Sequence, residues 1–447
     1  MKIKLMFVLP FVMVVLLGCA IIEHIGEPRY FALSISSDEP VSVYNLNRYA
    51  IWFCSGSETE SNTTIMAEAG DLLYITTEEI ELFYRFDPKD GQHLSFTSDP
   101  DAPYMTYLNG QLVCLGINDD PGVWEWIKEC DIRSLQHLQS LDFSGGLGEI
   151  LDLNLVKKIA KARPTIGLCL GDITKVSSEI LALFTPSWLY ISGSFDFNEV
   201  DTSRLKKLEC LFVFEPENTQ FIEELDHLET LILHSENDAG DLNLDRIAQL
   251  RSLTLSGWSN INGLENFSNR NRLRNLYFVG CETDDVSLIY LFPKLTGLGL
   301  YYCDVDIDLL ELQDLSRLRW LSFPPNVSQS DFATFLSQHP ELKVVDLINC
   351  DKINDLSPLA SLAEIQGLTL EVAVEDLSPL YQLTDLQVLT LGEDSFDEED
   401  YQNLQESLPN TQIVTGYCLG SGWLLLMIPC IAVGSVVIHL ARKRSSG

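Results

Sequence analysis

The chain has 447 residues, 46% of them hydrophobic and 21% charged, so it can bury the cores of about two or three domains. Its 65 acidic residues against 29 basic ones give a formal net charge of −36, which repels nucleic acid and anionic lipid headgroups. A DNA or RNA partner would need a basic stripe, and none is visible in the sequence. We therefore expect a solvated acidic surface and no nucleic-acid partner.

The amino-terminal end has the pattern of a secretory signal. Two lysines precede an apolar run from Leu5 to Leu17, so residues 1–18 are predicted to be a signal peptide. The run closes on a Leu-Leu-Gly-Cys sequence ending at Cys19, which resembles the lipobox of bacterial lipoproteins. That resemblance implies cleavage before Cys19 and lipidation of its side chain. Ordinary signal cleavage after Ala20 is the alternative.

Residues 27–133 lack the repeat described below and are predicted to form a β-rich N-terminal domain and cap. Apolar runs bounded by turn residues predict strands. These runs are Tyr30–Ile35, Tyr49–Cys54, Leu72–Thr76, Ile80–Phe86, Tyr104–Tyr107 and Gln111–Ile117. Asn109-Gly110 predicts a type I′ hairpin turn between the last two, and Asp120-Pro121 opens a predicted helix. An independent ligand-binding module is the alternative to a cap.

A leucine repeat occupies residues 134–415. Its pattern, Leu-x-x-Leu-x-Leu, recurs in about 12 copies at intervals of 20 to 27 residues. The middle apolar residues of these copies are 141, 168, 189, 211, 231, 253, 276, 298, 321, 345, 368 and 389. Alternating apolar and polar residues predict a short strand with one buried face. Because each unit buries its apolar edge only by stacking on its neighbours, the strands are predicted to lie parallel in one sheet.

This pattern resembles the leucine-rich-repeat family, in particular the short bacterial repeats of the internalin type. The nearest matches are Asp355-Leu-Ser-Pro-Leu359 and Asp376-Leu-Ser-Pro-Leu380, in which the Ser-Pro step is predicted to start a short helical turn. The resemblance implies an α/β solenoid, a curved horseshoe with a parallel concave sheet, preceded by the β-rich N-terminal region.

The same resemblance explains several cysteines. The family places Asn or Cys three residues after the last strand leucine, where the side chain bonds backbone groups of the turn. The residues in this slot are Cys281, Cys303, Asn326 and Cys350. We expect these thiols to be buried and structural, since no Cys-x-x-Cys pair suggests a metal site. An exported location permits disulfides among the other cysteines, and the sequence alone does not assign their pairs.

The outward residues of the predicted strands line the concave face, and many of them are aromatic. The candidate ligand-binding residues are Trp188, Tyr190, Phe212, Phe214, His234, Tyr277, Tyr301 and Trp320. Aromatic side chains gathered on an exposed face are typical of a binding hot spot. The alternative is that flanking segments cover them, or that the register slips in the irregular early copies.

The carboxy-terminal part is predicted to cap the sheet and then cross a membrane. Residues 397–408 form a predicted helix whose acidic start is solvated rather than a calcium loop, and 411–415 a last strand. Residues 423–441 are long and apolar enough to span a bilayer, and the basic tail at 442–447 should stay cytoplasmic. A bacterial sorting signal has the same outline. A lipidated Cys19 is typical of an outer-membrane protein, whereas a spanning helix is typical of the inner membrane. The two predictions therefore conflict, and we expect only one of them to hold.

No catalytic motif, metal site or cofactor site is recognisable in the sequence. We therefore expect no enzyme and no cofactor, with an enzyme hidden in residues 27–130 as a remote alternative. The leading prediction is a membrane-anchored scaffold, periplasmic or at the cell surface, that binds a protein on its concave face. The alternative is a structural or adhesion element of the envelope, or a glycan-binding one, without a single specific ligand.

Overall fold

The structure is a computed structural model, and it describes most of the chain between residues 28 and 415. The described residues are 28–37, 41–46, 62–77, 81–99, 102–117, 121–143, 152–171, 175–192, 201–216, 219–235, 244–258, 264, 267, 269–281, 287–303, 312, 314–392 and 395–415. The predicted signal, Cys19, the strand at 49–54, the apolar segment 423–441 and the basic tail all lie outside these residues.

Thirteen short strands form the solenoid. Each is three to five residues long, and together they supply one rung per repeat. They are β9 Ser140–Phe143, β10 Gly167–Leu170, β11 Trp188–Ile191, β12 Cys210–Phe214, β13 Thr230–His234, β14 Ser252–Ser256, β15 Asn275–Val279, β16 Gly297–Tyr301, β17 Trp320–Ser322, β18 Val344–Ile348, β19 Gly367–Glu371, β20 Val388–Leu391 and β21 Gln412–Thr415.

The register of these strands follows the leucine repeat. Every strand pairs in parallel with the next, and the middle apolar residue of each copy lies opposite its counterpart, from Leu141 opposite Leu168 to Leu368 opposite Leu389. Ile413 of β21 adds a further rung after Leu389. The predicted fold class, a leucine-rich-repeat solenoid with a parallel concave sheet, is therefore confirmed.

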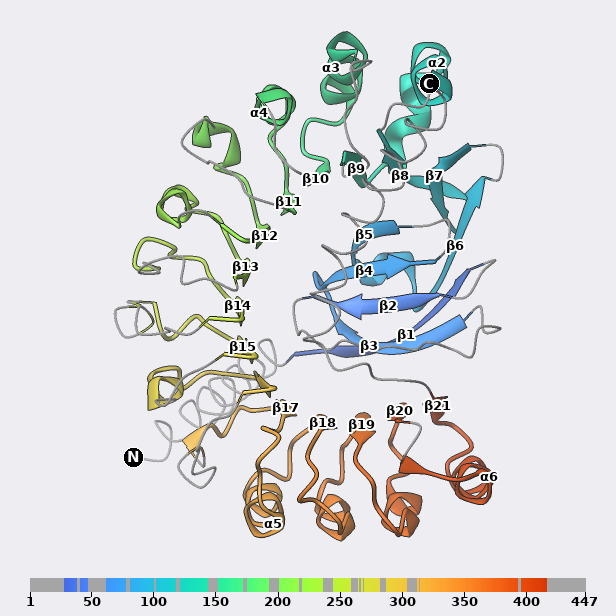
Figure 1. Ribbon diagram of the computed structural model, residues 1–447, viewed down its shortest axis with the longest axis vertical. Helices are drawn as coiled ribbons and strands as arrows, with labels where there is room; N and C mark the ends of the chain where they lie inside the picture. The colour runs from blue at the N-terminus through green and yellow to red at the C-terminus, as the bar shows by residue number, and fades with distance from the viewer. Residues whose placement is uncertain are drawn as a thin grey trace, which may run out of the picture.

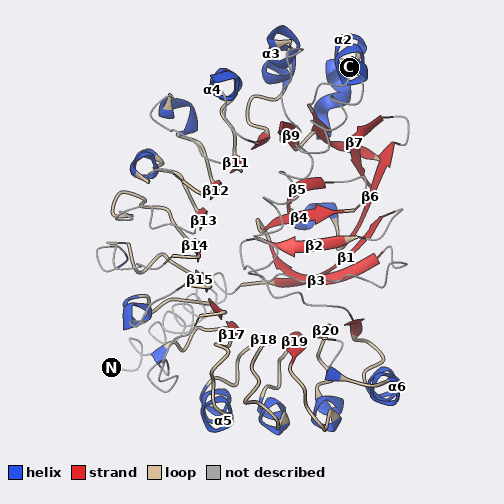
Figure 2. Ribbon diagram, in the orientation of Figure 1, coloured by secondary structure: helices blue, strands red, loops and turns tan. Residues whose placement is uncertain are grey.

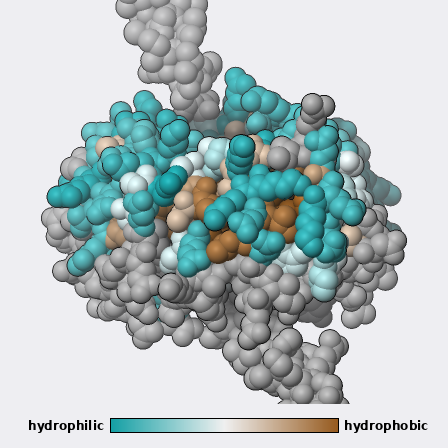
Figure 3. Space-filling model, turned by 90° about the horizontal axis from the view of Figure 1, so that it is seen from above, coloured by the Kyte–Doolittle hydropathy of each residue, from teal (hydrophilic) through white to brown (hydrophobic). Residues whose placement is uncertain are grey.

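Helices and turns return the chain along the outside of the arc, as Figures 1 and 2 show. The α-helices are α2 Pro121–Glu129, α3 Leu153–Ala162, α4 Lys175–Leu181, α5 Gln329–Gln338 and α6 Glu398–Ser407. The 3-10 helices are η1 Pro88–Asp90, η2 Ile132–His137, η4 Thr202–Leu205, η5 Gln220–Glu224, η7 Ser287–Leu291, η9 Ser357–Ser361 and η10 Ser378–Gln382. Figure 3 looks down on the side of α2 and α3, where the coloured surface is largely hydrophilic.

Two local predictions about helix starts agree with these elements. The Ser-Pro steps start η9 and η10, where Asp355 and Asp376 accept hydrogen bonds from the backbone N–H of Ser357 and Ser378, both at 2.8 Å. The acidic run begins α6 with a capping box at Asp397. An acidic first turn stabilises a helix through its dipole, which explains the run without a metal.

The N-terminal β region, which we define as residues 28–117, contains two sheets. Its strands are β1 Tyr30–Ser37, β2 Ser42–Asn45, β3 Asn62–Glu68, β4 Leu72–Thr76, β5 Glu81–Arg85, β6 His93–Asp99, β7 Ala102–Leu108 and β8 Gln111–Gly116. Strands β2, β4 and β5 form a small antiparallel sheet. The β7–β8 hairpin turns at Asn109 and Gly110, whose φ angles of 50° and 79° suit the predicted I′ turn. Strands β2, β3 and β6 were not predicted.

One continuous sheet joins this region to the solenoid. Strands β3, β1, β6, β7 and β8 pair in that order, and β8 then pairs in parallel with β9, placing Leu115 opposite Leu141. The resulting sheet has 18 strands. Strand β8 thus covers the first rung, as an N-terminal cap must.

The rest of the N-terminal β region lies inside the arc. Figure 1 shows β1 to β5 filling the space that the rungs β11 to β20 surround. The solenoid is therefore a horseshoe whose hollow side is occupied by the N-terminal β region of its own chain.

Candidate binding surface

All eight predicted ligand-binding side chains are buried. They are Trp188, Tyr190, Phe212, Phe214, His234, Tyr277, Tyr301 and Trp320, and none is more than 8% exposed. Their predicted orientation is correct, because each stands on the concave face. The expectation that this face is exposed is wrong.

We call these eight residues the aromatic band, and its first part packs against β4 and β5. Leu72 and Phe83 share a hydrophobic cluster with the outward residues of β11 to β13, including Phe212. Phe83 stacks on Tyr190 with ring centroids 4.0 Å apart, and its centroid lies 6.4 Å from that of Trp188. Such contacts remove the rings from water and stabilise the docked arrangement.

The second part of the band packs against β1 and β3. Trp320 joins Val344, Val388 and other residues of the late rungs in the core of the N-terminal β region. Tyr30 meets Trp320 edge to face with ring centroids 5.5 Å apart. Gly367 makes room on this face, since a Cβ at that position would lie 2.9 Å from Cγ of Met66. The two halves of the arc therefore hold the same inserted region.

A buried carboxylate accepts hydrogen bonds from the polar tips of two band residues. Asp346 on β18 accepts hydrogen bonds from the Tyr301 hydroxyl and the Trp320 indole N–H, each at 2.8 Å, and from the Thr369 hydroxyl at 2.6 Å. Burial, and then the charge of Asp346, raise the pKa of Tyr301 well above its ordinary value. The hydroxyl therefore stays a donor. Asp346 was not among the predicted site residues, although an acidic residue at an outward strand position was a signal for it.

His234 is also part of the buried face. Its ring stacks on Phe214 with centroids 4.2 Å apart, and its Nδ1 lies 2.9 Å from the Ser256 hydroxyl. Burial lowers the pKa of His234 to about 4. The imidazole is consequently neutral near pH 7, and it behaves as a packed aromatic residue rather than as a free ligand-binding group.

The residues of the predicted Asn/Cys slot lie at the turns after the rungs. Cys281, Cys303 and Cys350 are at most 1% exposed. Their Sγ atoms donate to backbone carbonyls, Cys281 to Leu255 at 3.3 Å, Cys303 to Tyr301 at 3.4 Å and Cys350 to Ile348 at 3.5 Å. Asn326 is half-buried and its backbone carbonyl accepts a bond from Lys352 at 3.1 Å. Cys114, Cys130, Cys169 and Cys210 are likewise unbridged.

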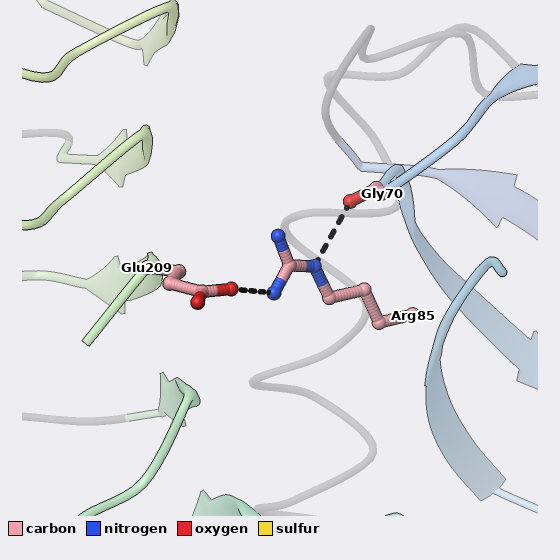
Figure 4. Close-up of polar contacts among 3 residues, drawn as sticks. All are labelled: Gly70, Arg85 and Glu209. Carbon is pink, nitrogen blue, oxygen red and sulfur yellow. Dashed lines mark hydrogen bonds and ion pairs between the residues drawn. The ribbon is translucent and has the colours of Figure 1, made fainter. Parts of the chain in front are cut away.

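An ion pair ties the N-terminal β region to the edge of the solenoid. Arg85 on β5 donates through Nη1 to Glu209, which directly precedes β12, and through Nε to the carbonyl of Gly70 at 3.4 Å (Figure 4). Arg85 is 27% and Glu209 47% exposed, so solvent weakens the pair. The ion pair mainly fixes the position of β5 against the edge of the rungs.

Beside this ion pair lies a cleft of about 700 Å³ between the N-terminal β region and the solenoid. One wall belongs to the N-terminal β region and includes Glu68, Asp71 and Arg85, and the other is the edge of the solenoid at the start of the strands. The solenoid wall contains Glu229, Thr230, Arg251, Ser252, Asn271, Arg272, Arg274, Asn275, Lys294 and Thr296.

Along this edge of the solenoid runs a basic row, which we define as Arg251, Arg272, Arg274, Lys294 and Arg317, and its first four members line the cleft. These residues flank the first leucine of four consecutive repeats. The rungs are direct neighbours, because the N–H of Arg274 donates to the carbonyl of Arg251 and the N–H of Thr296 to that of Arg274, both at 2.7 Å. The expectation that the chain lacks a basic stripe is thus wrong. Residues about 22 positions apart in sequence become neighbours one rung apart.

The described residues contain neither a metal-binding cluster nor a membrane-spanning helix. No group of three or more His, Cys, Asp or Glu side chains there is placed to hold a metal ion. None of the helices in that part of the chain has the length and apolar character needed to cross a bilayer.

Comparisons with known proteins give likenesses of structure alone. No protein-family model and no curated protein matches the sequence. An internalin of Listeria monocytogenes is 16% identical over 67% of this chain and 90% of its own, with a TM-score of 0.35. A leucine-rich-repeat protein of Leptospira interrogans is 15% identical over 63% and 90%, with a TM-score of 0.31. The yeast Rad7 and Elc1 complex matches at 15% identity over 66% and 83%, with a TM-score of 0.39. The fold is assigned from the strand register of the chain itself.

Proposed function

We propose that this chain is a membrane-anchored protein, held outside the cytoplasm, whose leucine-rich-repeat body binds another protein. The proposed binding surface is the open edge of the solenoid beside the cleft rather than the concave aromatic band. The observation that carries this proposal is the packing of Trp188, Tyr190, Phe212, Phe214 and Trp320 of that band against the N-terminal β region. A partner on the band would first have to displace a docked region, whereas the edge is accessible as the chain stands.

Solenoid architecture supports a binding role for the edge. Rungs about 4.8 Å apart present equivalent side chains in rows, which is how repeat proteins build extended binding surfaces. Arg251, Arg272 and Arg317 of the basic row are exposed. Arginine is enriched at protein interfaces because its guanidinium forms bidentate hydrogen bonds with carboxylates. A ligand could contact the concave aromatic residues, as the sequence predicted, only after the N-terminal β region had moved away from them.

The anchoring half of the proposal rests on the two ends of the sequence. The signal at 1–18 ending before Cys19, the apolar segment 423–441 and the basic tail support a chain with its bulk outside the cytoplasm. The test compares the full chain with a Cys19→Ala variant, a deletion of 423–441, and both changes together. We expect alkaline carbonate to leave the full chain in the membrane fraction and to release the doubly changed chain. Release of the unchanged full chain would contradict anchoring.

The binding half is tested with a photo-reactive amino acid at position 272 of the full chain, and at position 161 on α3 as the control. We expect one protein to cross-link through position 272 only. Once identified by mass spectrometry and purified, it should rebind the unmodified chain saturably. Equal labelling at both positions, or no saturable rebinding, would instead favour a structural element of the envelope without a specific ligand.

A further inference from the structure

The basic row is an excess of positive charge in a strongly acidic protein. Among the described residues, no acidic side chain forms an ion pair with Arg251, Arg272, Arg274, Lys294 or Arg317. The neighbouring Arg319, by contrast, pairs with Glu341. With 65 acidic residues in the chain, a basic row that no described acidic side chain neutralises is unexpected unless its partner is external.

The pKa and the hydrogen bonds of Arg274 show that its side chain lies among the other positive charges of the basic row. Burial, followed by the charges of Arg317, Arg251 and Arg272, lowers the pKa of Arg274. The side chain is held in place through Nη1, which donates to the carbonyls of Asn271 at 2.9 Å and of Arg272 and Leu273 at 3.2 Å. The guanidinium is therefore half-buried, fixed and surrounded by like charges, and an anion beside it would relieve that repulsion.

The dimensions of the patch suit an extended peptide. The basic row runs over four successive rungs, which at about 4.8 Å per rung is a length of roughly 14 Å. A strand-like peptide covers that length with about four residues at ~3.3 Å each. The cleft of about 700 Å³ is lined by four members of this row, Arg251, Arg272, Arg274 and Lys294, so that a segment can lie across it.

The opposite side of the cleft disfavours a nucleic acid. Glu68 lines this side and Glu229 lies on the solenoid wall, and their carboxylates can accept the N–H groups of a peptide backbone, which the phosphodiester backbone of a nucleic acid lacks. No aromatic side chain is among the described residues that line the cleft, so these residues offer no platform on which single-stranded bases stack. The net charge of −36 also repels long polyanions.

We propose that the basic row and the cleft beside it bind an acidic segment of the protein partner, about four residues long in its contacting part. The carboxylates of the segment pair with Arg251, Arg272 and Arg274, and Lys294 and Arg317 extend the contact along the edge. This inference rests on the proposed function, since it names the chemistry of the partner at the same edge.

The test uses two fluorescein-labelled peptides, one with four consecutive glutamates and one with glutamines in their place, and the full chain in detergent. We expect saturable binding of the glutamate peptide by fluorescence anisotropy, lost at high salt, and little binding of the glutamine peptide. Arg251→Ala with Arg272→Ala should weaken binding by about tenfold or more. Both side chains are exposed, so the change leaves the core intact.

The matched control is Lys157→Ala with Lys161→Ala on α3, which removes the same charge from an exposed position elsewhere. This control should bind the glutamate peptide as the unchanged chain does. The proposal is overturned if the glutamate peptide does not bind, if the control loses as much affinity, or if an oligothymidylate of matched charge binds as tightly. If the purified partner still rebinds in those cases, only the acidic-segment inference fails and the interaction function stands.

Discussion

Phe83 of β5 stacks on Tyr190 of β11 with ring centroids 4.0 Å apart and ring planes inclined by 29°. The first residue belongs to the N-terminal β region and the second to the concave face of the solenoid. Aromatic residues gathered on this face do form a binding surface, but what they bind in this structure is a segment of the same chain. The solenoid and the N-terminal β region share one continuous sheet, and two hydrophobic clusters each contain residues of both. They therefore form one body.

Removing the Phe83 ring should destabilise the docked arrangement. Phe83 is 5% exposed and contacts Tyr74, Trp188 and Tyr190, so Phe83→Ala leaves a cavity at the interface. We expect the free energy of unfolding in urea to fall by about 3 kcal/mol. The matched control is Phe396→Ala, at a half-buried phenylalanine beside α6, which should cost clearly less. Equal costs for the two variants would argue that β5 is not docked.

A glycine on the concave face should not tolerate a methyl group. A Cβ on Gly299 would lie 2.4 Å from Cδ1 of Tyr277 and 2.7 Å from Cε2 of Tyr301, both rings being buried. We expect Gly299→Ala to lower the free energy of unfolding by about 1–3 kcal/mol. Gly116→Ala on β8 is the control, because its nearest neighbour would be 3.6 Å away. A neutral Gly299→Ala would mean that the two tyrosines stand away from the face.

The ion pair between Arg85 and Glu209 should contribute only modestly. Both side chains are partly exposed, and pairs of that kind contribute about 0.2–1 kcal/mol. A double-mutant cycle with Arg85→Ala and Glu209→Ala should therefore give a coupling energy of about 0.5 kcal/mol that declines at high salt. A coupling energy of zero at low salt would contradict the contact.

Acid should weaken the fold through His234. Its pKa is about 4 in the folded chain against an ordinary value of 6.5, so the unfolded chain binds the extra proton between these values. Stability is complete above pH 6.5 and is lost as the pH falls toward 4, by about 3 kcal/mol for this residue. His339, whose pKa burial also lowers, adds a change of the same sign. Urea unfolding at several pH values measures the loss, and His234→Phe should flatten the curve. An equally steep curve for that variant would exclude His234 as its source.

The sequence predicted the parts of this structure that repeat. Leucines such as Leu141 and Leu389 return at nearly constant spacing, and each rung buries the same face, so the register follows from the pattern alone. The orientation of Trp320 was predictable for the same reason. Its burial was not, because alternation shows which way a side chain points and contains no information on what docks against it from elsewhere in the chain.

The basic row could have been predicted by reading one column of the repeat. Arg251 and Arg274 each follow the first leucine of their copies, and the predicted stacking makes them neighbours. Overall charge concealed them, since an average over the chain does not show where the few basic residues gather. The cleft itself was not predictable, because one of its walls contains Arg85 and depends on the docking of a separate region.

Zero-length cross-linking tests the docked N-terminal β region most directly. An Arg85→Lys variant of the full chain places an amine where the guanidinium now meets Glu209, and a carbodiimide joins an amine to a carboxylate in direct contact by an amide bond. Mass spectrometry should find position 85 joined to Glu209, and Glu209→Gln should abolish that product. Cross-links from position 85 to acidic residues of the N-terminal β region alone would show that this region does not lie in the hollow of the solenoid.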